Sequence, residues 1–223
     1  MVQGMDDQQN PASSPDGNWI LFWSTKPSGK PPSIKHLLRF PLSGGSPETI
    51  LDARNDDSVA FECGYSLAAG CIFSRPENGN LLFYQLDPTR GLGKRVGSIN
   101  APYGSFWAIS LDGSRLAITN KSVLDGQVMI LNLKDSTQRT FRISPECDIR
   151  DVNWAANGQS FYGICAGPAK ERIVRVDLDG RADVVLDLGK DQVIFGPLAS
   201  PDGRHLAFSE IFWESNNWLL ENF

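Results

Sequence analysis

A phrase of the form Ser-Pro-Asp-Gly, followed at once by an apolar run, recurs along the chain and constrains its fold more than any other feature. It stands at residues 14–17 and 200–203, and as Ser-Leu-Asp-Gly at 110–113. A divergent copy, Ala-Ala-Asn-Gly, stands at 155–158, and residues 75–83 contain a weaker copy that fits a different turn of the repeat. In such a phrase Asp accepts backbone hydrogen bonds and Gly adopts a positive φ. Because Asp-Gly between two strands is a strong hairpin signal, each copy predicts two strands joined by a tight turn.

The turn glycines repeat at a regular spacing. Gly113, Gly158 and Gly203 are 45 residues apart, and Gly17 precedes Gly113 by 96 residues, which is close to two such units. A period of about 40–45 residues is typical of the four-stranded blade of a β-propeller. The residues assigned to these turns are Asp16, Gly17, Asp112, Gly113, Asn157, Gly158, Asp202 and Gly203.

We therefore predict an all-β protein, a β-propeller of four-stranded antiparallel blades with about five blades present. The single domain spans residues 1–223, and residues 1–8 are a candidate closing strand. The predicted blades are residues 10–52, 58–100, 105–143, 149–187 and 193–223. The fifth unit is one strand short, so two arrangements stay open: a closed five-blade ring, or a fragment of a ring with six to eight blades.

Composition limits the classes of partner. The formal net charge of −5 argues against general nucleic-acid binding, and no run of 18 apolar residues predicts a membrane span. The first residues lack the charged-then-apolar layout of a secretion signal, so we expect any export signal on a longer parent chain. The six tryptophans fall at expected strand positions, where we assign them to packing between blades.

The Ser-Pro-Asp-Gly phrase before an apolar strand resembles the WD40-like (PD40) repeat of TolB-type β-propellers, and residues 41–47 resemble the outer hairpin of the same repeat. Four stretches are also similar to the C-terminal propeller of certain bacterial multidomain proteins: Cys63 with 71–74, 86–93, 200–208 and 215–223. In that family the propeller follows a serine/threonine kinase or a winged-helix domain and senses or binds a ligand. The resemblance implies such a domain upstream on a parent chain.

No catalytic set emerges from the sequence. The two histidines, His36 and His205, are isolated from any nucleophile, and no Gly-x-Ser-x-Gly elbow exists. Phosphate-loop, calcium-loop and paired zinc-ligand spacings are also missing. The prediction is a protein without enzymatic activity, cofactor or metal. Although Asp16, Asp112 and Asp202 resemble a carboxylate set, each is better explained as the cap of its own turn.

The cysteines have two readings. Cys63 and Cys71 flank one expected hairpin, so their side chains are candidates for a disulfide across neighbouring strands. A disulfide would require an oxidising compartment, which favours a periplasmic or extracytoplasmic location over the cytoplasm. The alternative is a pair of small buried thiols.

If the propeller binds a ligand, loops that lead into the inner strands around the channel are the expected place. The candidate residues there are Asp57, Tyr103, Arg150, Asp151 and Gln192. We expect the partner to be a protein, a peptide or a small polar ligand. The leading hypothesis is a non-catalytic interaction or sensing propeller, the C-terminal module of a larger bacterial signalling protein. The alternatives are a TolB-like periplasmic scaffold that binds a peptide, or a propeller enzyme of the lactonase or glycosidase type.

Overall fold

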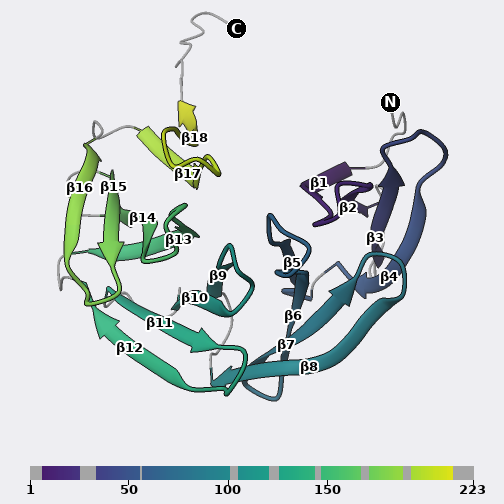
Figure 1. Ribbon diagram of the computed structural model, residues 1–223, viewed down its shortest axis with the longest axis horizontal. Helices are drawn as coiled ribbons and strands as arrows, with labels where there is room; N and C mark the ends of the chain where they lie inside the picture. Colours follow the sequence, from purple (N-terminus) through teal and green to yellow (C-terminus); the bar gives the residue numbers. More distant parts are fainter. Residues whose placement is uncertain are drawn as a thin grey trace, which may run out of the picture.

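The computed structural model describes residues 7–25, 34–55, 57–100, 105–120, 126–143, 147–166, 171–187 and 192–212. All the regular elements in these ranges are β-strands, and within each sheet the strands consecutive in sequence pair antiparallel. The all-β prediction and the four-stranded antiparallel blade are therefore confirmed. The blades follow one another along an arc, with β1 near one end and the β17–β18 hairpin at the other (Figure 1).

Four complete sheets make up most of the arc. Blade 1 contains β1 (Asp7–Ser13), β2 (Trp19–Thr25), β3 (Ile34–Pro41) and β4 (Glu48–Arg54). Blade 2 contains β5 (Ala60–Cys63), β6 (Cys71–Glu77), β7 (Asn80–Asp87) and β8 (Gly91–Asn100). Blade 3 contains β9 (Ser105–Ile109), β10 (Arg115–Asn120), β11 (Gln127–Asn132) and β12 (Gln138–Arg142). Blade 4 contains β13 (Asp148–Trp154), β14 (Ser160–Ala166), β15 (Glu171–Asp177) and β16 (Ala182–Asp187).

The prediction of about five blades is wrong in number, because the described residues form four blades and a hairpin of β17 (Gln192–Ala199) and β18 (Leu206–Phe212). Each copy of the repeated Ser-Pro-Asp-Gly phrase marks only the first hairpin of a unit. The turn at Gly203 therefore showed that two strands were present without showing that a four-stranded sheet followed. Residues 213–223 of the predicted fifth blade lie outside the described residues.

Strand β1 was only partly anticipated, because its sequence, Asp-Gln-Gln-Asn-Pro-Ala-Ser, lacks the apolar and β-branched residues that favour strands. It nevertheless pairs with the apolar β2, with Gln9 opposite Trp23. A register shift follows Gln9, and Asn10 adopts a φ of 52° there, as at a β-bulge. Residues 7 and 8 of the candidate closing strand thus belong to blade 1.

The hydrophobic core lies between consecutive blades. Trp23 of blade 1 contacts Phe61 of blade 2, with ring centroids 6.1 Å apart. The next junctions use Phe83 with Trp107, at 5.5 Å, and a cluster around Trp154 and Phe161. Since strand side chains alternate between faces, each inner blade supplies one face to each neighbour. The junction of blade 4 with the last hairpin is smaller: its fully buried members are Ile164, Ile173 and Ile194.

Candidate functional site

The regular Asp-Gly turns satisfy their own polar groups. In blade 3, Ser110 Oγ donates to Asp112 Oδ1 at 2.6 Å and accepts the Arg115 N–H at 3.0 Å. Asp112 Oδ1 also accepts the Ser114 N–H at 3.1 Å, and these bonds lower the pKa of the Asp112 carboxyl against the opposing effect of burial. The turns at Asp16 and Asp202 repeat the same bonds. The three carboxylates therefore belong to separate turns, one each in blade 1, blade 3 and the last hairpin.

The divergent copy in blade 4 keeps part of this arrangement. Asn157 Oδ1 accepts the Gln159 N–H at 2.9 Å, as Asp would, and the Gly158 N–H donates to the Ala155 carbonyl at 3.0 Å. Ala155 replaces the serine and supplies no hydroxyl. The serine of the phrase is a contributor that the turn-based prediction passed over, although its recurrence at positions 14, 110 and 200 was visible in the sequence.

Blade 2 departs from this plan, because a longer connection, residues 64–70, joins β5 to β6. The Gly64 N–H donates to the Gly70 carbonyl at 2.9 Å, and the Ala69 N–H donates to the Ser66 carbonyl at 3.0 Å. At its base, Cys63 and Cys71 are opposite one another in the β5–β6 pairing and form a disulfide, with Cα atoms 4.0 Å apart. Cys147 and Cys165, in blade 4, form a second disulfide.

The 64–70 connection also rests on the turn of blade 3. Ala69 is buried, and a Cβ placed on Gly113 would lie only 2.4 Å from the Cα of Ala69. Gly113 is therefore needed twice, for its φ of +71° and for the close approach of a neighbouring blade. Ser66 Oγ adds a long hydrogen bond of 3.4 Å to the Leu111 carbonyl.

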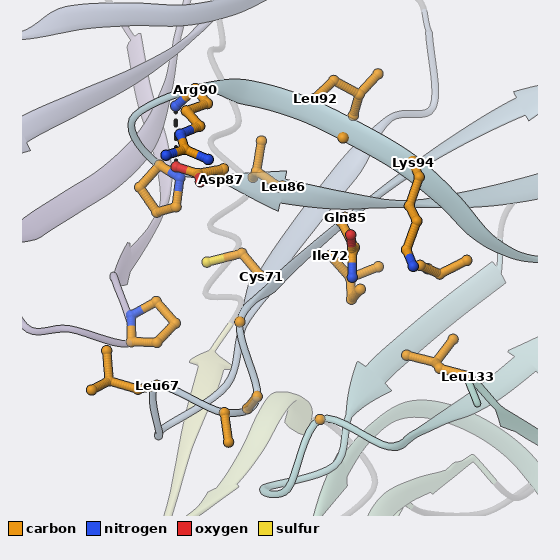
Figure 2. Close-up of a pocket in the computed structure, with 18 of the residues that line it drawn as sticks. Leu67, Cys71, Ile72, Gln85, Leu86, Asp87, Arg90, Leu92, Lys94 and Leu133 are labelled. Carbon is orange, nitrogen blue, oxygen red and sulfur yellow. Dashed lines mark hydrogen bonds between the residues drawn. The ribbon is translucent and has the colours of Figure 1, made fainter.

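A cavity of about 900 Å³ opens between this connection and the hairpin of β7 and β8 (Figure 2). Its floor is Cys71, Ile72, Gln85 and Leu86, and residues 67–70 and 87–94 form its walls. Pro15 and Asp16 of blade 1 line it as well, together with Gly113, Ser114, Leu133 and Lys134 of blade 3. The volume is at the upper end of the range usual for ligand sites.

The β7–β8 wall is held in place from two directions. Asp87 Oδ1 accepts the N–H groups of Thr89 and Arg90, at 2.8 and 3.1 Å, and the bonds from Thr89 are the main cause of its lowered pKa. From blade 1, Arg39 Nη1 donates to the Pro88 carbonyl at 2.8 Å. Register shifts between β7 and β8 place extra residues in β8 around Lys94. A bulge of this kind redirects side chains, and Figure 2 shows Lys94 extending from β8 into the cavity.

The residues predicted to line the channel do not meet at this cavity. Arg150 and Asp151 lie in β13 of blade 4, where Arg150 pairs with Glu171, and Asp151 Oδ2 accepts the Gly196 N–H at 2.5 Å. Burial raises the pKa of Asp151, although the bond from Gly196 opposes the shift. Asp151 thus joins blade 4 to the last hairpin directly, whereas Arg150 does so through Glu171, whose Oε2 accepts the Ile194 N–H at 2.9 Å. Gln192 is the first residue of that hairpin.

The other two candidates are separate. Asp57 is exposed beyond β4, and its Oδ2 accepts the Arg54 N–H at 3.2 Å, as in a turn cap. Tyr103 lies outside the described residues. Of the histidines, His36 Nδ1 is 2.7 Å from Asp52 Oδ1 across β3 and β4, and His205 is exposed. The described ranges contain no cluster of three or more His, Cys, Asp or Glu side chains able to hold a metal ion.

Glu62 is a polar residue that sequence reasoning missed. It lies in β5, partly buried, and its Oε2 accepts the Ile109 N–H of blade 3 at 2.7 Å. Burial raises the pKa of Glu62 to about 8; the Ile109 bond opposes this shift, and the charge of Asp151 adds to it. A single Glu within an otherwise apolar strand, Ala-Phe-Glu-Cys, was the available signal.

Comparison with known proteins supports the fold. No family model and no curated protein matches the chain. Among solved structures, a protein assigned as TolB from Agrobacterium tumefaciens aligns with a TM-score of 0.72 and 21% identity, over 95% of this chain and 72% of that one. TolB from Acinetobacter baumannii aligns with a TM-score of 0.64 and 16% identity, over 95% of this chain and 53% of that one.

Propellers with other assigned activities align as well. A protein assigned as a 6-phosphogluconolactonase from Bacteroides uniformis gives a TM-score of 0.55 and 13% identity, over 89% of this chain and 63% of that one. A puromycin hydrolase gives a TM-score of 0.57 and 18% identity, over 92% of this chain and 33% of that one. At these identities the comparisons show a shared β-propeller fold alone, and this chain spans only part of each structure.

Proposed function

We propose that this chain is a non-catalytic, TolB-like propeller that binds a protein or peptide in the cavity beside blade 2. The observation that carries the proposal is the construction of this cavity. Blade 2 replaces the compact Asp-Gly turn with a longer connection, and this connection is fastened by a disulfide and by the contact of Ala69 with Gly113. A rigid wall with outward-facing side chains favours binding, because little ordering is required when the ligand arrives.

Exposed apolar side chains on both walls support the same proposal. Leu67 is 76% exposed on the 64–70 connection, and Leu92 is 41% exposed on β8. Large apolar side chains that border a concave site commonly serve as contacts for a partner. The TolB-like part of the proposal rests on the aligned TolB structures, which share the propeller fold of this chain. The hypothesis of an upstream kinase or winged-helix domain is compatible with such a role and stays a prediction.

The test is selection of a random-peptide phage library on the purified protein, followed by fluorescence anisotropy with the enriched peptides. Leu92→Glu should abolish binding, because it replaces an exposed apolar contact on the β8 wall of the cavity by a charge. Val184→Glu is the matched control: Val184 is 56% exposed on β16, also an outer strand, and is remote from the cavity. Failure to enrich any peptide, or equal binding by both variants, would overturn the proposal.

A propeller enzyme is the second candidate, and one observation favours it. Glu62 and Asp151 both have raised pKa values, and the charge of Asp151 contributes to the shift at Glu62. Carboxyl groups with raised pKa values are common among catalytic acids. Chromogenic lactone and glycoside substrates test this candidate, with Glu62→Gln as the inactive variant. The absence of turnover in the wild-type protein would leave the binding role as the better explanation.

A further inference from the structure

The charges of the cavity differ from those of the chain as a whole. The chain carries a formal net charge of −5, but three cations line the cavity, Arg90, Lys94 and Lys134, against two carboxylates, Asp16 and Asp87. Lys94 is exposed on β8, and Lys134 follows β11 in blade 3. The cavity is thus bordered by positive groups from two blades.

The carboxylates and the lysines are not equally available to a ligand. Asp16 accepts the Ser14 hydroxyl, at 2.5 Å, and the backbone and side-chain N–H groups of Asn18, so its charge is held within its own turn. Asp87 is bound in the same way by Thr89 and Arg90. In the described part of the chain, by contrast, neither Lys94 nor Lys134 takes part in an ion pair. The charge of Lys134 helps to lower the pKa of its neighbour Asp135, but the main cause is Thr137, whose side chain and N–H hold that carboxylate. Lys94 and Lys134 are therefore available to a ligand.

Apart from Gln85, the floor between them is apolar. Ile72 and Leu86 are buried beneath it, and Val96 and Leu133 contribute partly buried side chains. An extended peptide sends successive side chains to opposite sides, so it can place apolar groups on the floor and carboxylates toward the rim. A free acidic metabolite would use the lysines without needing the floor or the exposed Leu67 and Leu92.

We propose that the cavity selects an extended, acidic segment of a partner protein, with carboxylates at Lys94 and Lys134 and an apolar side chain on the floor between β8 and the 64–70 connection. This inference rests on the proposed function and adds the chemistry of the partner to it. Complementary charge of this kind raises the association rate and excludes partners of the wrong sign. Binding is therefore expected to weaken as salt is added.

The experiment measures fluorescence anisotropy with a labelled short peptide of alternating glutamate and leucine, and with its glutamine–leucine counterpart. The glutamate peptide should bind at least roughly tenfold more tightly, and Lys94→Glu with Lys134→Glu should remove that preference. Arg95→Glu is the matched control, since Arg95 is exposed on the same strand next to Lys94 but does not line the cavity.

The possible outcomes distinguish a failure of the acidic preference from a failure of peptide binding itself. Equal binding of the two peptides, with both sensitive to Leu92→Glu, would overturn the acidic preference and leave peptide binding intact. Binding of neither peptide, together with a failed library selection, would overturn both. If a single-stranded DNA oligonucleotide binds as tightly as the glutamate peptide and with the same sensitivity to the lysine variants, the cavity is a general polyanion site and the inference is wrong. The inference is supported if the lysine variants lose the preference for the glutamate peptide and Arg95→Glu retains it.

Discussion

Blades 2 and 3 have the same four-stranded plan, yet they differ in the connection between their first two strands. Blade 3 uses a tight turn in which Ser110 and Asp112 satisfy the local backbone. Blade 2 uses residues 64–70, which are held from outside by the Cys63–Cys71 disulfide and by the blade 3 turn. A turn whose polar groups are hydrogen-bonded to one another leaves few of them available to bind a ligand. A connection anchored by its neighbours can present its side chains, and the cavity lies beside it.

The contact between the two connections gives the largest expected effect. Gly113→Ala should lower the free energy of unfolding by about 2–5 kcal/mol, because it combines a strained positive φ with a clash against Ala69. Gly17→Ala is the control: its φ of +69° is nearly the same, but nothing lies within 4 Å of its Cβ position. It should cost about 1–2 kcal/mol. Chemical denaturation measures both, and equal losses would show that the blade 2 connection does not rest on the blade 3 turn.

Removal of the disulfides gives the second largest expected loss of stability. Replacing Cys63 and Cys71 together by serine should cost about 2–4 kcal/mol and should increase amide exchange in residues 64–70. Replacing Cys147 and Cys165 should cost a similar amount without changing exchange there, because that disulfide lies in blade 4. Denaturation and hydrogen exchange by mass spectrometry would check this. Unchanged exchange in residues 64–70 of the first variant would show that the disulfide does not hold the cavity wall.

Glu62 gives the smallest effect, and it depends on pH. Its pKa is raised from 4.5 to about 8, so the folded protein retains a proton that the unfolded chain loses. The stabilisation is complete below about pH 4.5 and falls as the pH rises toward 8. Relative to Glu62→Gln, which keeps an acceptor for the Ile109 N–H, the wild-type protein should lose on the order of 1–3 kcal/mol across this window. This is less than the full pKa shift implies, because Glu62 is only partly buried and solvent screens its charge. If the free energies of unfolding of the two proteins change in parallel with pH, the raised pKa of Glu62 is refuted.

Sequence reasoning reached the repeated unit because the chemistry of that unit is local. The bonds of Asp16, Asp112 and Asp202 join residues within the same short turn, and that pattern can be read along the chain. It failed for β1, which is polar and becomes a strand by pairing with β2. The candidate residues Arg150 and Asp151 lie away from the cavity, where Arg150 pairs with Glu171 and Asp151 accepts the Gly196 N–H of the last hairpin, so a binding role for them stays a prediction.

The sequence by itself determined the antiparallel hairpins, the period of the blades and the all-β class, since these depend on turn residues and on nearby apolar runs. The tertiary structure decided the number of complete blades, the cavity and the environment of Glu62. These features arise from contacts such as that of Glu62 with Ile109 and that of Ala69 with Gly113. Such contacts join residues one repeat apart, and no local preference of the chain specifies which side chains will meet when one blade packs against the next.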